Sequence, residues 1–160
     1  MKTTTILLVL LFIVTLSKSQ TLKELSTLRL VVNINQADKF LSERGFVYDR
    51  AVVFKNNESI STTVFFKKQY VDIGFNAFVS LSKGKGDLIY SVGYNTNSLK
   101  KFNDLKKECE LMPNCELGYE ETKSNGNYDR YFLDGTTTYV FSIYPENENT
   151  TLFRYWVSIF

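Results

Sequence analysis

Early in the chain, the hydrophobic residues recur with the period of a helix. Leu22, Leu25 and Leu28 follow one another every three residues, which predicts a short helix after Thr21. The stretch LRLVV, which begins at Leu28, either extends this helix or forms a strand, and its periodicity leaves both interpretations open. The first helix is therefore predicted without a defined end.

A second helix is predicted shortly afterwards. The segment Asn33-Ile34-Asn35 has the polar residues that favour an N-cap. Ala37, Phe40 and Leu41 then fall on one face of the helix. Gly45 is expected to end it, because glycine readily adopts the backbone conformation of a C-terminal cap.

From Phe46 the hydrophobic period changes to two, as is typical of strands. The strands predicted by this alternation are VYDRAVVFK (47–55), SISTTVFFKK (59–68), YVDIGFNAFVSLS (70–82) and DLIYSVGYN (87–95). In the third strand, the predicted buried row is Val71, Ile73, Phe75, Ala77, Val79 and Leu81, and the wetter row is Asp72, Gly74, Asn76 and Ser80, with Phe78 as an exception. Turns are predicted at Asn56-Asn57-Glu58 and from Lys83 to Gly86.

The second half of the chain repeats this change from helix to strands. Asn97-Ser98 is a favourable N-cap, and Pro113-Asn114 is expected to stop the helix. The apolar stripe between them consists of Leu99, Phe102, Leu105, Cys109 and Met112. The strands predicted to follow are residues 115–123, 128–134, 136–144 and 151–160, with turns at SNGN and PENENT.

The common order of elements suggests an internal repeat of residues 20–95 and 96–160. In each half, a helix leads through a corner into a meander of strands, and FLSERGFVY at the first corner parallels ECELMPNCELGY at the second. The predicted fold class is therefore α+β. It comprises two tandem helix–β-meander units that form an antiparallel sheet, with the helices packed on one face.

The N-terminus has the features of a secretory signal peptide. After a short positive start, residues 6–14 form an apolar run, and Ser17 and Ser19 provide a small-residue cleavage pattern. The run is too short for a transmembrane helix, which needs about 20 apolar residues. We predict residues 1–19 to be the signal peptide and residues 20–160 to be one secreted or periplasmic domain without a transmembrane segment.

Removal of the signal peptide would change the net charge of the chain. The full sequence has 19 Lys+Arg and 17 Asp+Glu. Loss of Lys2 and Lys18 makes the two numbers equal, so the predicted mature chain is formally neutral. Neither a basic footprint for nucleic acid nor an acidic tail remains, so no nucleic-acid partner is predicted.

Three stretches resemble a known group of proteins. FLSERGFVYDRA, SLKKFNDLKKEC and LFRYWVSIF resemble uncharacterised small secreted proteins of Gram-negative bacteria, which carry a similar signal ending in Ser-Gln. The doubled helix–meander is similar to the beta-lactamase-inhibitor-protein type of fold, and single copies of the unit occur in small lipoproteins of outer-membrane assembly. The resemblance implies binding of another protein through a sheet face and loops, and it transfers no binding residue to this chain.

The chain contains no histidine. This excludes Ser-His-Asp and Cys-His nucleophile systems, histidine-ligated zinc and the usual proton shuttle at neutral pH. Gly84-Lys85-Gly86 opens no helix and is expected to be a turn and not a phosphate-binding loop. The stretch ENENTT lacks the ligand spacing of a calcium loop. The sequence thus predicts no catalytic residue, no cofactor and no metal.

Carboxylates are the remaining candidates for acid/base chemistry. They cluster in the second half, at Glu116, Glu120, Glu121, Asp129 and Asp134. A glycosidase needs two carboxyl groups roughly 5 to 9.5 Å apart. Neighbours in a strand point to opposite faces, so Glu120 and Glu121 are not expected to pair. The alternative interpretation is a set of solvated charges on the outer face of the sheet.

The chain has two cysteines, Cys109 and Cys115. Cys109 lies on the apolar stripe of its helix and Cys115 begins the next strand, while Leu41 and Phe46 hold the corresponding places in the first half. Export to an oxidising compartment favours a disulfide between the cysteines, and two free core thiols are the alternative.

Aromatic residues make up 15% of the chain, and adjacent aromatic residues in a strand point to opposite faces. We select Tyr128, Tyr131, Tyr155 and Trp156 as a candidate binding surface. The alternative is that helices cover one face while tyrosines lie at its edges.

The predicted function is a non-enzymatic, inhibitor-like protein-binding module whose partner is another secreted or envelope protein. A carboxylate-dependent glycan-active hydrolase and a structural component of a cell-envelope assembly are the alternatives.

Overall fold

The computed structural model of the protein describes residues 21–31, 33–55, 60–69, 76–84, 88–145 and 154–160. In these ranges the chain forms the helices α2 (Leu22–Arg29), α3 (Ile34–Ser42) and α4 (Leu99–Glu110). The strands are β1 (Val47–Lys55), β2 (Ile60–Gln69), β3 (Asn76–Lys83), β4 (Ile89–Thr96), β5 (Glu116–Thr122), β6 (Tyr128–Asp134), β7 (Thr137–Ile143) and β8 (Tyr155–Ile159). Every predicted helix and strand has a counterpart here. The predicted signal peptide of residues 1–19 lies outside the described residues, as do the predicted strand residues 59, 70–75, 87 and 151–153 and the turn residues 56–58, 85–86 and 146–150.

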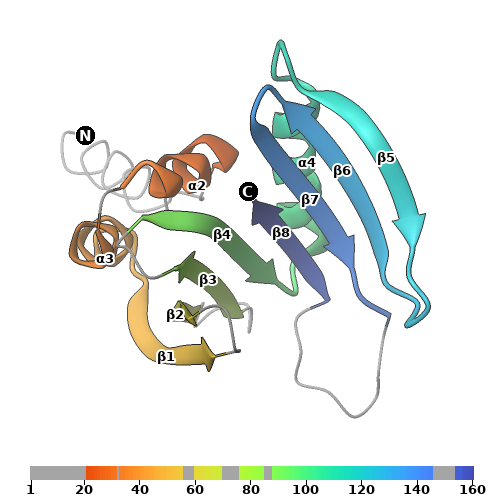
Figure 1. Ribbon diagram of the computed structural model, residues 1–160. Helices are drawn as coiled ribbons and strands as arrows, with labels where there is room; N and C mark the ends of the chain where they lie inside the picture. Colours follow the sequence, from red (N-terminus) through yellow and green to blue (C-terminus); the bar gives the residue numbers. More distant parts are fainter. Residues whose placement is uncertain (1–20, 32, 56–59, 70–75, 85–87, 146–153) are drawn as a thin grey trace, which may run out of the picture.

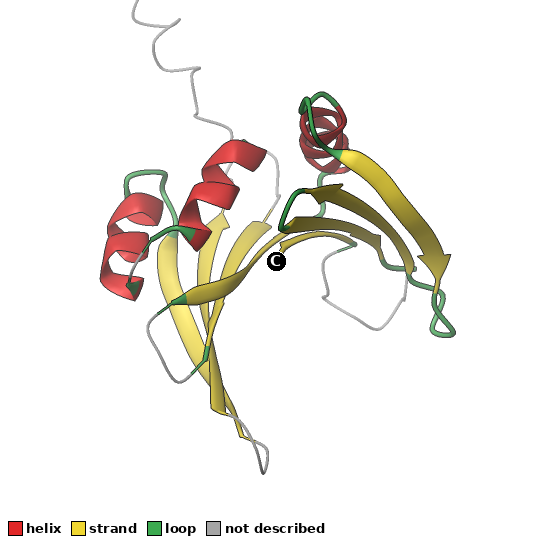
Figure 2. Ribbon diagram, turned by 45° about the horizontal axis from the view of Figure 1, so that its top comes forward, coloured by secondary structure: helices red, strands yellow, loops and turns green. Residues whose placement is uncertain are grey.

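All of these strands belong to one antiparallel sheet with the order β1-β2-β3-β4-β8-β7-β6-β5 (Figure 1). Each half of the chain therefore contributes one meander. The two meanders meet at their last strands, where residues 92–96 of β4 pair with residues 155–159 of β8. Figure 2 shows the helices on the same side of the bent sheet. The α+β class, with an antiparallel sheet and helices on one face, is confirmed.

Polar side chains fix where the helices begin. Thr21 accepts a hydrogen bond from the backbone N–H of Glu24, and the Glu24 carboxylate accepts one from the N–H of Thr21. This reciprocal capping box satisfies two N–H groups that the helix leaves without partners. Asn33 and Ser98 each accept a backbone N–H three residues further on, which confirms the predicted N-caps of α3 and α4.

The helix ends also follow from local chemistry. The helix α2 ends within the stretch LRLVV, since Leu28 and Arg29 are its last two residues and Leu30 is its C-cap. After α3, Gly45 adopts a φ of 78°, a conformation that glycine reaches at little cost. The turn brings the Phe46 N–H to within 3.0 Å of the Leu41 carbonyl oxygen, as expected for a glycine that ends a helix.

Rows of cross-strand neighbours form the core on the helix-covered face of the sheet. One buried row consists of Val64, Leu81, Val92, Ile159, Tyr139 and Phe132. The next consists of Phe66, Val79, Tyr94, Val157 and Phe141. Against them pack Leu22, Leu25 and Leu28 of α2 and Phe102, Leu105 and Cys109 of α4. Burial of each large apolar side chain contributes about 1.5–3 kcal/mol. Leu99 is half exposed, so the buried stripe of α4 is shorter than predicted.

Glu108 connects the two halves of the chain on the helix side. Its carboxylate accepts the backbone N–H groups of Leu22 at 2.8 Å and of Lys23 at 3.2 Å. Both groups lie in the first turn of α2 and have no partner within that helix. A carboxylate at this position also interacts favourably with the positive end of the helix dipole. Glu108 of α4 thus caps α2 from a distant part of the sequence.

We expect Glu108→Gln to lower the free energy of unfolding by about 0.5–2 kcal/mol, because the neutral amide is a poorer cap for α2. Glu110→Gln is the matched control on the same helix. Its ion pairs with Lys106 and Arg130 are long, at 3.7 and 4.0 Å, so a change within about 0.5 kcal/mol is expected. Urea denaturation of both variants measures the difference, and equal losses would contradict the capping role.

Candidate functional site

The sheet has a second face that no described helix covers (Figure 2), which we call the open face. Cross-strand neighbours point to the same side of a sheet, so the strand register identifies its members. One row across the open face is Phe65, Ser80, Gly93, Ser158, Val140, Tyr131 and Tyr119. The adjacent row is Lys67, Phe78, Asn95, Trp156, Ser142, Asp129 and Glu121.

At the centre of the open face, one large ring lies over small residues. A Cβ atom at Gly93 would lie 2.9 Å from Trp156 Nε1 and closer still to Ser80 Oγ. The Trp156 indole therefore occupies space that any residue other than glycine would fill. Trp156 Nε1 is buried and has no hydrogen-bond partner among the described residues. The junction of β4 and β8 thus presents an ordered aromatic ring on a floor of small polar side chains.

Tyrosines line the open face over the second meander. The rings of Tyr119 and Tyr131 stack at 4.1 Å with an interplanar angle of 14°. The Tyr131 hydroxyl donates a hydrogen bond to Glu121 at 2.8 Å. Burial and this hydrogen bond raise the pKa of Tyr131 above its ordinary value, so the hydroxyl stays protonated at neutral pH. Tyr144 lies against Trp156, with ring centroids 6.2 Å apart.

The four residues of the predicted binding surface lie on two different faces of the sheet. Tyr131 and Trp156 lie on the open face, whereas Tyr128 and Tyr155 point to the helix-covered side. Tyr155 is only 7% exposed, with its ring 5.1 Å from that of Phe102. Its assignment to an exposed surface is therefore wrong, because strand alternation turns it into the core. Tyr119, Gly93 and the serines of the open face were missed, although their alternation with apolar residues is visible in the sequence.

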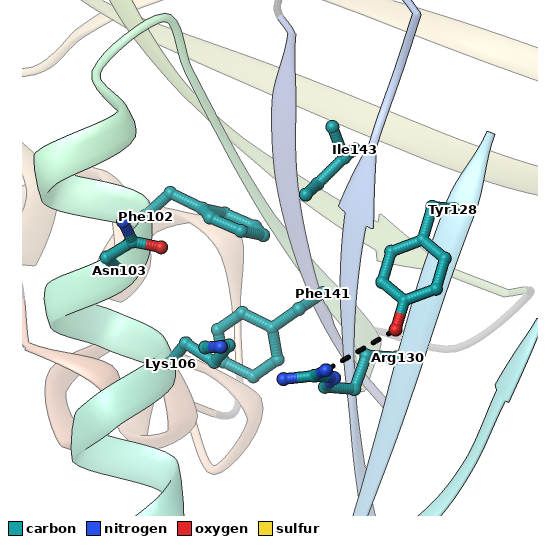
Figure 3. Close-up of a pocket in the computed structure, with 7 residues that line it drawn as sticks. All are labelled: Phe102, Asn103, Lys106, Tyr128, Arg130, Phe141 and Ile143. Carbon is teal, nitrogen blue, oxygen red and sulfur yellow. Dashed lines mark hydrogen bonds between the residues drawn. The ribbon is translucent and has the colours of Figure 1, made fainter.

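Tyr128 lines a separate cavity of about 150 Å³ between α4 and the sheet (Figure 3). The cavity is lined by Phe102, Asn103 and Lys106 from α4, by Tyr128 and Arg130 from β6, and by Phe141 and Ile143 from β7. The Arg130 guanidinium donates to the Tyr128 hydroxyl at 3.4 Å and forms an ion pair with Glu120. This ion pair is one cause of the lowered pKa of Glu120, after a hydrogen bond from Tyr128. Lys106 and Arg130 had not been identified from the sequence, because only the fold brings them together.

The carboxylates of β5 and β6 occupy both faces of the sheet, as predicted for neighbours in a strand. Glu120 faces Arg130, and Glu121 lies opposite Asp129 on the open face. Lys123 forms ion pairs with both Glu121 and Asp129. These acidic groups therefore belong to a compensated ion cluster. Within the described residues, no group of three or more His, Cys, Asp or Glu side chains is placed to hold a metal ion.

Cys109 and Cys115 meet at the corner between α4 and β5. Their sulfur atoms lie 2.8 Å apart, a longer distance than the roughly 2.05 Å of a disulfide bond, and the structure records them as two thiols. Burial raises the pKa of both thiols, and Cys109 is the more buried. Leu41 and Phe46, at the other corner, are also buried. The disulfide remains a prediction.

Comparisons with protein-family models, with curated proteins and with solved structures find no significant match to this chain. None of the helices in the described ranges is long and apolar enough to cross a membrane.

We expect the exported protein to contain a disulfide between Cys109 and Cys115. Alkylation under denaturing, non-reducing conditions followed by mass analysis should show no modified cysteine, and two modified cysteines would contradict the prediction. Reduction of the disulfide should lower the free energy of unfolding by about 2 kcal/mol, since the loop that the disulfide closes is short. In the reduced folded protein, Cys109 should be alkylated more slowly than Cys115 at neutral pH, because its burial disfavours the thiolate.

Gly93→Ala should destabilise the protein by about 1–3 kcal/mol, because the added methyl group meets Ser80 and the Trp156 indole. Gly84→Ala is the control, since a Cβ atom at Gly84 meets nothing within 4 Å. Thermal or urea unfolding measures stability, and Trp156 fluorescence reports the local change, as this is the single tryptophan of the chain. An unchanged fluorescence spectrum for Gly93→Ala would contradict the close packing.

Proposed function

We propose that the protein is a non-enzymatic binding protein and that its open face contacts another protein. The observation that carries this proposal is the composition of the open face around the β4–β8 junction. It combines tyrosines and one tryptophan with serine, glycine and asparagine. Trp156, Tyr131, Tyr119 and Ser158 are at least partly exposed there, whereas Ser80, Gly93 and Asn95 are buried in the same face. This is the mixture that antibody paratopes use to bind proteins.

The physical advantages of this mixture apply directly to the open face. Tyrosine and tryptophan bring a large contact area and lose little conformational entropy on binding. The stacking of Tyr119 on Tyr131 and the packing of Trp156 over Gly93 already order these rings. Their preorganisation lowers the entropy cost of association.

The sequence also indicates the compartment in which such a binding protein would act. The N-terminal signal pattern favours a secreted or periplasmic protein, so the partner would be another secreted or envelope protein. The resemblance to the beta-lactamase-inhibitor-protein type of fold favours an inhibitor-like role for the sheet face. In the alternative function, as a structural component of a cell-envelope assembly, the protein would use the same surface for a permanent contact with a neighbouring component.

For a carboxylate-dependent hydrolase, the predicted carboxylates that the strand register places opposite each other are Glu121 and Asp129, on the open face. Lys123 lies at ion-pair distance from both carboxylates. The Tyr131 hydroxyl also contacts both, at 2.8 and 3.4 Å. The space that a substrate would need between the carboxylates is thus taken by groups of the protein itself. This arrangement favours the binding protein over the hydrolase.

The proposal predicts a loss of partner capture when the open face is altered. Affinity capture from the native envelope, followed by mass spectrometry, should recover the same protein with the wild type and with Leu117→Ala. Tyr119→Ala combined with Tyr131→Ala should reduce its recovery at least about tenfold, since a few aromatic residues often carry much of the energy of an interface. Leu117 is a matched control because it lies on the same strand at the same 53% exposure as Tyr119 but on the opposite face.

Two outcomes would contradict the proposal. One is that no protein is recovered above background with the wild type. The other is that the double variant, still folded by circular dichroism, captures the same protein as well as the wild type does.

A further inference from the structure

We infer that the cavity between α4 and the second meander is a binding site for a small aromatic carboxylate. This site lies on the helix-covered side of the sheet, whereas the proposed protein-binding surface is the open face. The inference is therefore independent of the proposed function, and a failure of either would leave the other standing.

Three apolar side chains form one part of the cavity wall. Phe102 and Phe141 are almost fully buried, and their rings meet edge to face at 5.7 Å. Ile143 is half buried and completes this surface. The volume of about 150 Å³ is sufficient for one six-membered ring, since an apolar protein cavity of roughly that size binds benzene. The volume and these apolar side chains thus favour a single ring.

Two cations reach the cavity from opposite walls. Figure 3 shows Lys106 of α4 and Arg130 of β6 extending toward each other beside Phe141. Their side chains are only 26% and 27% exposed, so solvent screens their charges less than those of fully exposed residues. Two like charges that converge over an apolar surface favour an anion between them.

The acidic residues nearby leave room for such an anion. Glu120 forms an ion pair with Arg130 at Nε. The Tyr128 hydroxyl accepts a hydrogen bond from Arg130 Nη2 at 3.4 Å. Glu110 is shared by Lys106 Nζ at 3.7 Å and Arg130 Nη1 at 4.0 Å. Both distances exceed those of charge-assisted hydrogen bonds, which are about 2.7–2.9 Å. A ligand carboxylate between Lys106 and Arg130 would form the short contacts that Glu110 does not.

The two halves of the site select for the combination of ring and charge. A neutral ring of the same size would fill the apolar part but gain nothing from the cations. A small anion without a ring would meet the cations but would not displace water from the apolar part of the cavity. Benzoate combines both features and is the simplest probe for this class of ligand.

The experiment is a titration of the folded protein with benzoate, followed by two-dimensional NMR at low ionic strength. Saturable shifts are expected at the amide signals of the cavity residues, including Phe102, Lys106 and Ile143. Benzamide and acetate should each bind at least about tenfold more weakly, because each lacks one of the two recognised features. Shifts that do not saturate, shifts centred elsewhere, or equal binding of benzamide would overturn the inference.

Three variants test which charged residues contribute to benzoate binding. Lys106→Gln should weaken benzoate binding at least about fivefold, while Lys100→Gln on the exposed side of α4 should leave it unchanged. Glu110→Gln removes the carboxylate that competes for both cations and should strengthen binding about twofold to fivefold. A structural role of these residues alone would not produce a gain of affinity. Weaker or unchanged binding by a folded Glu110→Gln variant would count against the proposed geometry.

Discussion

The pairing of β4 with β8 is the contact on which the remainder of the structure depends. It joins two meanders from distant parts of the chain through residues 92–96 and 155–159. Without it, each meander would expose the backbone groups of one more edge strand. It also completes the core on the helix-covered face, because the buried rows that contain Val92 and Tyr94 of β4 continue with Ile159 and Val157 of β8. Both α2 and α4 contact β4, so the helices bridge the same junction that the strands form.

The same pairing produces the centre of the open face. Gly93 comes from the first meander and Trp156 from the second, and the indole lies over the glycine only because the two strands are neighbours. A glycine within a central strand is normally unfavourable, since it has no side chain to pack. Here its cost is offset by the ring that it admits. The most distinctive surface feature of the protein is thus a product of contact between its halves.

Strand β6 shows how one segment serves two candidate sites. Asp129 and Tyr131 point to the open face, while Tyr128 and Arg130 point toward α4. Alternation along a strand allows a broad, tyrosine-rich surface and a small cationic cavity to share a rigid support. Two charged residues of β6 form ion pairs, Asp129 with Lys123 and Arg130 with Glu120.

The sequence by itself determined the local structure of this protein. Capping residues such as Asn33 and Ser98 located helix starts, and alternation located the strands and the buried row of Ala77, Val79 and Leu81. These features depend on residues within a few positions of one another, and short-range sterics and hydrogen bonds decide them.

Only the tertiary structure decided the rest. The β4–β8 pairing, the capping of α2 by Glu108, the burial of Tyr155 and the convergence of Lys106 with Arg130 all join residues remote in sequence. Periodicity shows that a strand has two faces, but not which strands become neighbours. That choice is made by packing across the whole sheet, where a partner's position depends on every layer being filled at once.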